Sequence, residues 1–297
     1  MPAPENVEIA TFDGLKLAGH FYSAGSHQPC VIMSQGFSGL KEHFLPDYAQ
    51  RFNEAGYSVL TYDNRCWGSS EGLPRNHVDP FLQLRDYVDA FDFATTLPSV
   101  DRTKIVFWGS SMSGGNVISA AAIEKRVCAV ISQVPFVSGE QASQAFGPMH
   151  EIFLNERGAV RQGAAPTMVP VTAETVEEAL SGTCKAILPD PDAVGFHAEM
   201  DRRGYKREKM ATLQSALTMA LHEPHAVIHR IAPIPLLMVL GSRDVTIPTR
   251  TQLAMYSKAL EPKRLRIIKD AGHFDPYHGE AFEQNIQAQV DFLKEFV

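Results

Sequence analysis

I-V-F-W-G-S-S-M-S-G-G-N-V, residues 105–117, is an apolar run that ends abruptly in small residues and resumes as a helix-compatible segment. This order predicts a strand, a sharp turn and a helix, with a serine at the turn. Such a turn holds the serine in a strained backbone conformation, so that its hydroxyl stands clear of the sheet. Strand and helix almost touch there, which requires small residues two positions before and after the serine. Gly109 and Ser113 fill these positions, so Ser111 is the candidate nucleophile.

The segments on either side predict a mostly parallel sheet. Asp13-Gly14 separates two apolar runs and is a strong hairpin signal. Beyond it, strands alternate with helices, which is typical of βαβ units. The predicted strands are Val7–Phe12, Leu15–Tyr22, Pro29–Ser34, Tyr57–Tyr62, Lys104–Gly109, Val127–Val134, Pro235–Leu240 and Arg264–Ile268. The predicted helices are Leu45–Glu54, Pro80–Leu97 with Asp79 as N-cap, Met112–Glu124, Arg250–Leu260 and Glu280–Phe296.

The alternation breaks between Phe136 and Arg230, where no convincing β run is found. Amphipathic pieces, such as Thr175–Leu180 and Met210–Leu221, are separated there by proline and glycine. A loop of this length rarely lacks structure of its own, so an inserted helical cap is expected. We therefore expect an α/β core formed by residues 1–136 and 231–297, with a helical cap over residues 137–230.

Composition narrows the choice of partners and compartment. The chain has 297 residues, enough for one large α/β domain, and its net charge of −7 argues against nucleic acid as a partner. No apolar run approaches the roughly 20 residues of a membrane span, and the N-terminus lacks the basic and apolar regions of a signal peptide. Four scattered cysteines without CxxC spacing favour a reduced, cytoplasmic setting.

A serine hydroxyl is a weak nucleophile unless a histidine accepts its proton, and that histidine needs a carboxylate to orient it. Asp244 follows the predicted strand Pro235–Leu240, and His273 follows the last predicted strand. In open α/β sheets, reacting groups collect at the carboxyl ends of the strands. Ser111, Asp244 and His273 therefore form the candidate catalytic constellation, against the alternative of a surface serine, an N-cap aspartate and a polar loop histidine.

Two neighbouring residues compete for these roles. Ser113 also has small residues on both sides, but it lies deeper in the predicted helix, and Gly114 at the third position past Ser111 supports Ser111 as the nucleophile. Asp275 is close to His273 in sequence but does not follow another strand, so a solvated turn is the preferred interpretation.

The negative charge that forms when a serine attacks a carbonyl needs two backbone N–H donors. The residue after the nucleophile supplies one, here Met112. The second normally comes from the loop after an early strand, and Gln35-Gly36-Phe37 fits, with the Phe37 N–H as donor. The alternative is that Gly36 only makes a turn.

Four segments together resemble α/β-hydrolases: G-S-S-M-S-G-G (109–115), Y-D-N-R-C-W-G-S-S-E-G (62–72), I-A-P-I-P-L-L-M-V-L-G-S-R-D (231–244) and A-G-H-F (271–274). The chain looks most like the fungal branch with polyketide transferases and thioesterase-like hydrolases of secondary metabolism. The resemblance implies a Ser-Asp-His triad on Ser111, Asp244 and His273. It is weak over residues 137–230. Two departures are Ser113, where G-x-S-x-G has glycine, and Cys66, where relatives often have the first glycine of D-x-R-G-x-G.

Several other residues are better explained by a structural role than by catalysis or metal binding. Cys66 lacks a histidine of its own, so a catalytic cysteine is disfavoured. His222, His225 and His229 lie close together, but Pro224 breaks any common helical face, which argues against a metal site. The aromatic and methionine side chains of the cap fit an acyl pocket and the cap's own core equally well: Phe146, Met149, Phe153, Met168 and Phe196.

These observations predict an enzyme with an α/β-hydrolase fold that needs no metal or organic cofactor. The triad predicts action on an ester or thioester through an acyl-enzyme, and the resemblance implies a hydrophobic, polyketide-derived acyl group. Transfer of the acyl group to an alcohol or amine, and cyclisation or C–C bond chemistry by the same residues, are alternatives, and a non-catalytic binding protein is a third. The expected partner is a small acyl substrate, with an acyl carrier protein as one source; the sequence leaves a homo-oligomer open.

Overall fold

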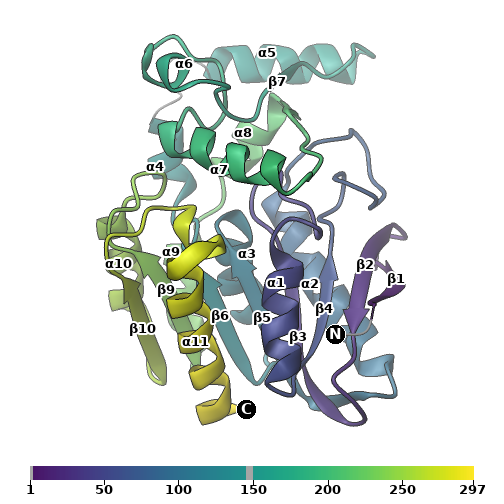
Figure 1. Cartoon of the computed structure of the whole chain (residues 1–297). Helices are drawn as coiled ribbons and strands as arrows, with labels where there is room; N and C mark the ends of the chain where they lie inside the picture. Colours follow the sequence, from purple (N-terminus) through teal and green to yellow (C-terminus); the bar gives the residue numbers. More distant parts are fainter. Residues whose placement is uncertain (1–2, 145–149) are drawn as a thin grey trace.

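The computed structural model describes residues 3–144 and 150–297. Its centre is an eight-stranded sheet in the order β1-β2-β4-β3-β5-β6-β9-β10 (Figure 1). The β1–β2 and β2–β4 pairs are antiparallel, and all other neighbouring pairs are parallel. The strands are β1 (Glu5–Ala10), β2 (Lys16–Tyr22), β3 (Gln28–Ser34), β4 (Ser58–Tyr62), β5 (Val100–Ser110), β6 (Ala129–Gln133), β9 (Leu236–Gly241) and β10 (Lys263–Ile268). The predicted, mostly parallel α/β sheet is confirmed.

Helices cover both faces of this sheet because its central strands are apolar on both sides. In β3, Cys30 and Ile32 pack into the core on one face, and Val31 and Met33 pack into the core on the other. α2 (Pro80–Thr96), α3 (Met112–Ala121) and α10 (Thr249–Lys258) cover the first face; α1 (Leu45–Glu54) and α11 (Gly279–Phe296) cover the second. Continuous apolar strands of this kind are typical of sheets buried between two helix layers.

The helix ends follow the local chemistry of the sequence. The carboxylate of Asp79 accepts hydrogen bonds from the backbone N–H groups of Phe81 and Leu82, as expected of an N-cap ahead of a proline. α1 has the predicted bounds, whereas α3 ends at Ala121, before the predicted Glu124. No described helix combines the length and apolarity that a membrane span requires.

Most of the segment between β6 and β9 lies above the ends of the strands (Figure 1), but its last turns, residues 224–231, pack against α3 of the core. Its elements are α4 (Gly139–Ser143), α5 (His150–Arg161), β7 (Met168–Pro170), α6 (Val176–Leu180), α7 (Pro191–Arg202), β8 (Met210–Thr212), α8 (Gln214–Met219), α9 (Pro224–Val227) and the 3-10 helix η2 (Ile228–Ile231). We call residues 137–230 the cap.

The expectation of no β structure in the cap is wrong. β7 and β8 form a separate antiparallel pair, in which Met168 lies opposite Thr212. Met210–Leu221, expected to be one amphipathic piece, therefore begins as a strand, and α8 covers only Gln214–Met219. Strands of three residues are too short to produce a period-two pattern, and their pairing partner is remote in sequence.

Candidate active site

Ser111 lies at the turn between β5 and α3, where the backbone is strained. Its φ of 56° and ψ of −119° are rare for a residue with a side chain, and such conformations cost about 1–3 kcal/mol each. A Cβ added to Gly109 would lie 2.1 Å from the carbonyl oxygen of Ser113. Strand and helix therefore touch as predicted, and the Ser111 hydroxyl is the group that the turn exposes.

His273 and Asp244 complete a hydrogen-bonded chain with Ser111. Asp244 follows β9 and His273 follows β10, so both come from loops at the carboxyl end of the sheet. The distance from Ser111 Oγ to His273 Nε2 is 3.0 Å, and that from His273 Nδ1 to Asp244 Oδ2 is 2.8 Å. His273 and Asp244 are both buried. The structure thus brings the three predicted residues together within direct hydrogen-bond distance.

The surroundings of Asp244 determine which His273 nitrogen carries the proton. Gln252 Nε2 donates to Asp244 Oδ2 at 2.8 Å, and the Ile247 N–H donates to Oδ1 at 2.9 Å. A carboxylate that accepts these bonds also accepts one from His273 Nδ1–H. This assignment leaves the lone pair of Nε2 facing the Ser111 hydroxyl. Sequence reasoning missed Gln252; its only signal was a glutamine on the buried face of α10.

The loop after β3 lies directly against the serine. A Cβ on Gly36 would lie 2.7 Å from the Cβ of Ser111, so only glycine allows this approach. The next residue is Phe37. In the part of the chain that the structure describes, the N–H groups of Phe37 and Met112 donate to no protein acceptor. These are the two predicted oxyanion donors, and both are free to bind a substrate oxygen.

Gln35 fixes the conformation of this loop. Its carbonyl oxygen accepts from Ser113 Oγ at 2.6 Å and from Asn64 Nδ2 at 3.0 Å. Its side-chain Nε2 donates to the His43 carbonyl oxygen at 2.8 Å, while its Oε1 accepts from the Gly36 N–H at 3.0 Å. The hydroxyl of Ser113 therefore holds the Phe37 loop against α3, whereas the hydroxyl that lies next to His273 is that of Ser111.

Ser113→Ala is expected to lower kcat about tenfold with little change in KM. The substitution removes one of two donors to the Gln35 carbonyl, a loss of about 1–3 kcal/mol for a buried group, and this peptide orients the loop that carries the Phe37 N–H. Steady-state kinetics on an ester substrate measures the effect. Ser132→Ala is the matched control, since Ser132 Oγ likewise donates to a backbone carbonyl, that of Gly114. Equal losses in both variants would contradict a role through the loop.

Asp275 and Cys66 have structural roles. Asp275 is exposed and accepts from the Gly272 N–H at 2.6 Å, which closes a turn. Cys66 is buried, and burial raises the pKa of its thiol, which makes it a poor nucleophile. Its φ of 69° lies in the left-handed region, which glycine adopts without the steric cost that a side chain brings.

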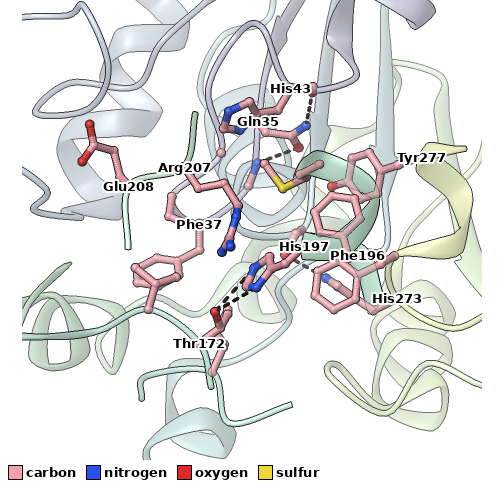
Figure 2. A pocket seen from close by; sticks show the side chains of 18 of the residues that line it. Gln35, Phe37, His43, Thr172, Phe196, His197, Arg207, Glu208, His273 and Tyr277 are labelled. Atoms are coloured by element: carbon pink, nitrogen blue, oxygen red, sulfur yellow. Dashed lines mark hydrogen bonds between the residues drawn. The ribbon is translucent and has the colours of Figure 1, made fainter. Parts of the chain in front are cut away.

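A cavity of about 70 Å³ lies between the core and the cap, with Ser111 and His273 in its wall (Figure 2). Phe37 and Tyr277 of the core and Phe196 of the cap supply apolar lining. The cap adds the apolar side chains of Val171, Leu188 and Met200. It also adds a polar or charged set: Thr172, His197, Arg207, Glu208 and Lys209.

The sequence left open whether five cap side chains line an acyl pocket or form the cap's own core, and the structure places them differently. Phe196 lines the cavity, whereas Phe153 packs with Leu213 and Ala216 in the cap's own core. Met168 is 38% exposed and does neither. Phe146 and Met149 lie outside the described residues.

The histidines near Pro224 do not form a metal site. Among the residues that the structure describes, no group of three or more His, Cys, Asp or Glu side chains is arranged to hold a metal ion. His222 stacks on Phe136, with ring centroids 5.8 Å apart, and burial lowers the pKa of its imidazole to about 4. It is a neutral packing residue.

A serine on a strand-to-helix turn, hydrogen-bonded to a histidine that is in turn bonded to an aspartate, both on later loops of one sheet, is the arrangement of an α/β-hydrolase. The model of the "Alpha/beta hydrolase family" matches residues 31–285, and the chain belongs to that family. A thiohydrolase from Eupenicillium brefeldianum is 32% identical over 98% of this chain and 94% of its own length. The polyketide transferase grgF from Penicillium sp is 33% identical, covering 97% and 95%.

A solved structure supports the same family assignment. The crystal structure of the α/β-hydrolase GrgF from Penicillium sp. sh18 matches with a TM-score of 0.85 at 32% identity, covering 100% of this chain and 99% of that one. The predicted resemblance to fungal polyketide transferases and thioesterase-like hydrolases is confirmed. The protein is thus an enzyme of the hydrolase or acyltransferase type.

Proposed function

We propose that the enzyme cleaves an ester or thioester of a hydrophobic, polyketide-derived acyl group through an acyl-enzyme on Ser111. The observation that carries this proposal is the chain from Ser111 through His273 to Asp244, which opens on a cavity with aromatic walls. The names of the thiohydrolase and polyketide transferase relatives support an acyl thioester as the substrate class.

In the first step, Ser111 Oγ attacks the acyl carbonyl carbon while its proton passes to His273 Nε2. The N–H groups of Phe37 and Met112 bind the resulting oxyanion, and each such donor is worth about 2.7–4 kcal/mol of barrier. Asp244 stabilises the imidazolium that forms. The imidazolium then protonates the leaving thiol or alcohol, and the C–S or C–O bond breaks.

In the second step, His273 Nε2 accepts a proton from the incoming acceptor as that acceptor attacks the acyl carbon. The bond between the acyl carbon and Ser111 Oγ then breaks, and His273 returns the proton to Oγ. Water gives the free acid; an alcohol or amine gives the transferred acyl product. The cavity of about 70 Å³ is small beside the roughly 300–1,000 Å³ of typical ligand pockets. A long acyl chain therefore has to extend through the cavity opening or displace cap side chains.

The test uses a hexanoyl thioester of N-acetylcysteamine in ¹⁸O-water, with product masses read by mass spectrometry. Hydrolysis is expected to release the thiol and place one ¹⁸O atom in hexanoic acid. Addition of a primary alcohol distinguishes acyl transfer, which would yield the hexanoyl ester in competition with the acid. Conversion of an acyl substrate without thiol release would instead favour acid/base cyclisation or isomerisation by His273.

Two further expectations remain proposals. An acyl carrier protein is one source of the thioester, a proposal that the name of the polyketide transferase relative supports. The free state of the four cysteines, of which Cys30 and Cys66 are buried, supports a reducing compartment such as the cytoplasm.

A further inference from the structure

The cavity beside Ser111 has a charged side chain in its cap wall that the proposed mechanism does not use. Arg207 lies between α7 and β8, and its side chain is only 11% exposed. A guanidinium so far removed from water is costly unless its donors are bound. Figure 2 draws its nitrogen end within the pocket, next to the His197 ring.

Asp201 binds one edge of the Arg207 guanidinium and leaves another nitrogen unused. Nε lies 3.2 Å from Asp201 Oδ1, and Nη2 lies 3.4 Å from Oδ2. Asp201 is 61% exposed, so it holds the guanidinium from the solvent side. Among the described residues, Arg207 Nη1 has no hydrogen-bond acceptor. Asp201 thus fixes the orientation of the Arg207 guanidinium, and Nη1 remains available to donate to a ligand.

The other charged cavity residues are not partners of this donor. Glu208 accepts from Asn76 Nδ2 at 3.3 Å, and Figure 2 shows its carboxylate directed away from Arg207. Lys209 Nζ pairs with Glu174 at 3.2 Å. No carboxylate of the cavity wall therefore neutralises the inner side of the guanidinium.

His197 and Thr172 extend the same wall with neutral hydrogen-bonding groups. Burial, together with the nearby charge of Arg207, lowers the pKa of His197 to about 4, so its imidazole is neutral at physiological pH. The Thr172 hydroxyl lies 3.4 Å from the ring nitrogens. A neutral imidazole and a hydroxyl carry one donor each, and their mutual hydrogen bond uses one of the two, so the pair has one donor left for a ligand oxygen.

We propose that Arg207, with His197 and Thr172, forms a subsite that binds an anionic oxygen of the acyl substrate. The inference rests on the proposed function and specifies its substrate class. Two sources supply such an oxygen: a carboxylate at the far end of the acyl group, or a phosphate on the arm that carries the thioester. Phe37 and Phe196 line the same cavity and contact the apolar part of the acyl chain.

The carboxylate source is tested with p-nitrophenyl half-esters of adipate and suberate, against the neutral hexanoate and octanoate esters of equal length. The phosphate source is tested with hexanoyl-coenzyme A, against hexanoyl-N-acetylcysteamine. Arg207→Gln removes the charge but keeps hydrogen-bonding groups, and Arg207→Lys restores the charge. Arg202→Gln is the matched control, because Arg202 also pairs with a carboxylate, Glu199, but is 70% exposed.

Arg207→Gln is expected to lower kcat/KM on one of the anionic substrates by about 10- to 100-fold, since a hydrogen bond to a charged group is worth about 1.5–3 kcal/mol. The neutral partner substrate is expected to change less than about twofold, and Arg207→Lys to recover part of the loss. Loss on the half-esters identifies the acyl carboxylate, and loss on the coenzyme A thioester identifies the phosphate. Equal changes on charged and neutral substrates, or none, would overturn the proposal.

A binding measurement separates this inference from the proposed function. Isothermal titration of Ser111→Ala with suberate and with coenzyme A is repeated on Ser111→Ala/Arg207→Gln. The subsite predicts that Kd for one ligand rises about tenfold or more with the second substitution. If the wild-type protein shows no acyl turnover but binding to Ser111→Ala depends on Arg207, the subsite is retained and the acyl-enzyme is rejected. Acyl turnover that does not depend on the charge of the substrate would retain the acyl-enzyme and reject the subsite.

Discussion

Replacing Ser111 with alanine is expected to lower kcat for ester and thioester cleavage by roughly 10⁵- to 10⁶-fold. The substitution removes the oxygen that lies 3.0 Å from His273 Nε2 and would form the acyl bond. The donors at Phe37 and Met112 remain, so a residual acceleration over water is expected from them alone. Steady-state kinetics on the hexanoyl thioester, with the thiol product detected, measures the loss.

The fold of Ser111→Ala is expected to be intact. Alanine has the same Cβ in the same backbone conformation, and the Ser111 backbone bonds to Gln133 and Phe136 do not involve the hydroxyl. An unchanged melting temperature is the control. Full activity of this variant would be incompatible with an acyl-enzyme and would favour acid/base chemistry by His273.

Arg65→Met is expected to lower the free energy of unfolding by about 3–5 kcal/mol at pH 8, because it leaves a buried charge without its partner. Asp86 is 0% exposed on α2, and Arg65 Nε donates to its Oδ2 at 2.8 Å. The other edge of the guanidinium binds Asp13, which is half exposed and contributes less. Urea unfolding monitored by fluorescence measures the loss.

The loss in Arg65→Met is expected to shrink as the pH falls. Burial raises the pKa of Asp86 above its ordinary value of 3.8, and Arg65 opposes that rise, so removing Arg65 raises the folded-state pKa further. An acid with a raised folded-state pKa loses stability as pH rises through the interval between its unfolded and folded values. The variant is therefore less impaired at pH 5 than at pH 8.

A double variant separates the lost charge partner from lost packing. Arg65→Met/Asp86→Leu removes both charges and is expected to recover most of the stability at pH 8, since apolar replacements of buried pairs are often neutral. A double variant as unstable as Arg65→Met, with the same loss at both pH values, would show that the cost arises from packing alone.

The triad and the sheet were predictable because their signals are local. Residues 105–117 carry the apolar strand, the small residues and the helix in one run, and Asp244 and His273 each follow a recognisable buried strand. Because each residue follows a predicted strand, all three are expected at the carboxyl ends of the sheet. Predicting that these residues lie near one another required no information on contacts between remote segments, only the positions of the strands in the sequence.

The groups that were missed depend on contacts between remote segments. Arg207 faces the cavity only because the cap folds over the core, and no periodicity marks its position. The Arg65–Asp86 pair joins a loop to a helix, and in sequence each residue looks like an ordinary surface charge. Ser113 was noticed as a departure from G-x-S-x-G, but its bond to Gln35 required the position of the β3 loop.

The most direct test of the central claim is mass spectrometry of the protein after reaction with a fluorophosphonate, which labels serines activated by a histidine. We predict a single adduct, on the peptide that contains Ser111, which is lost in Ser111→Ala and strongly slowed in His273→Ala. The label is expected to remain in Ser113→Ala. An adduct on Ser113 or Cys66, or no adduct in folded protein that cleaves the thioester, would contradict the assignment of Ser111 as nucleophile.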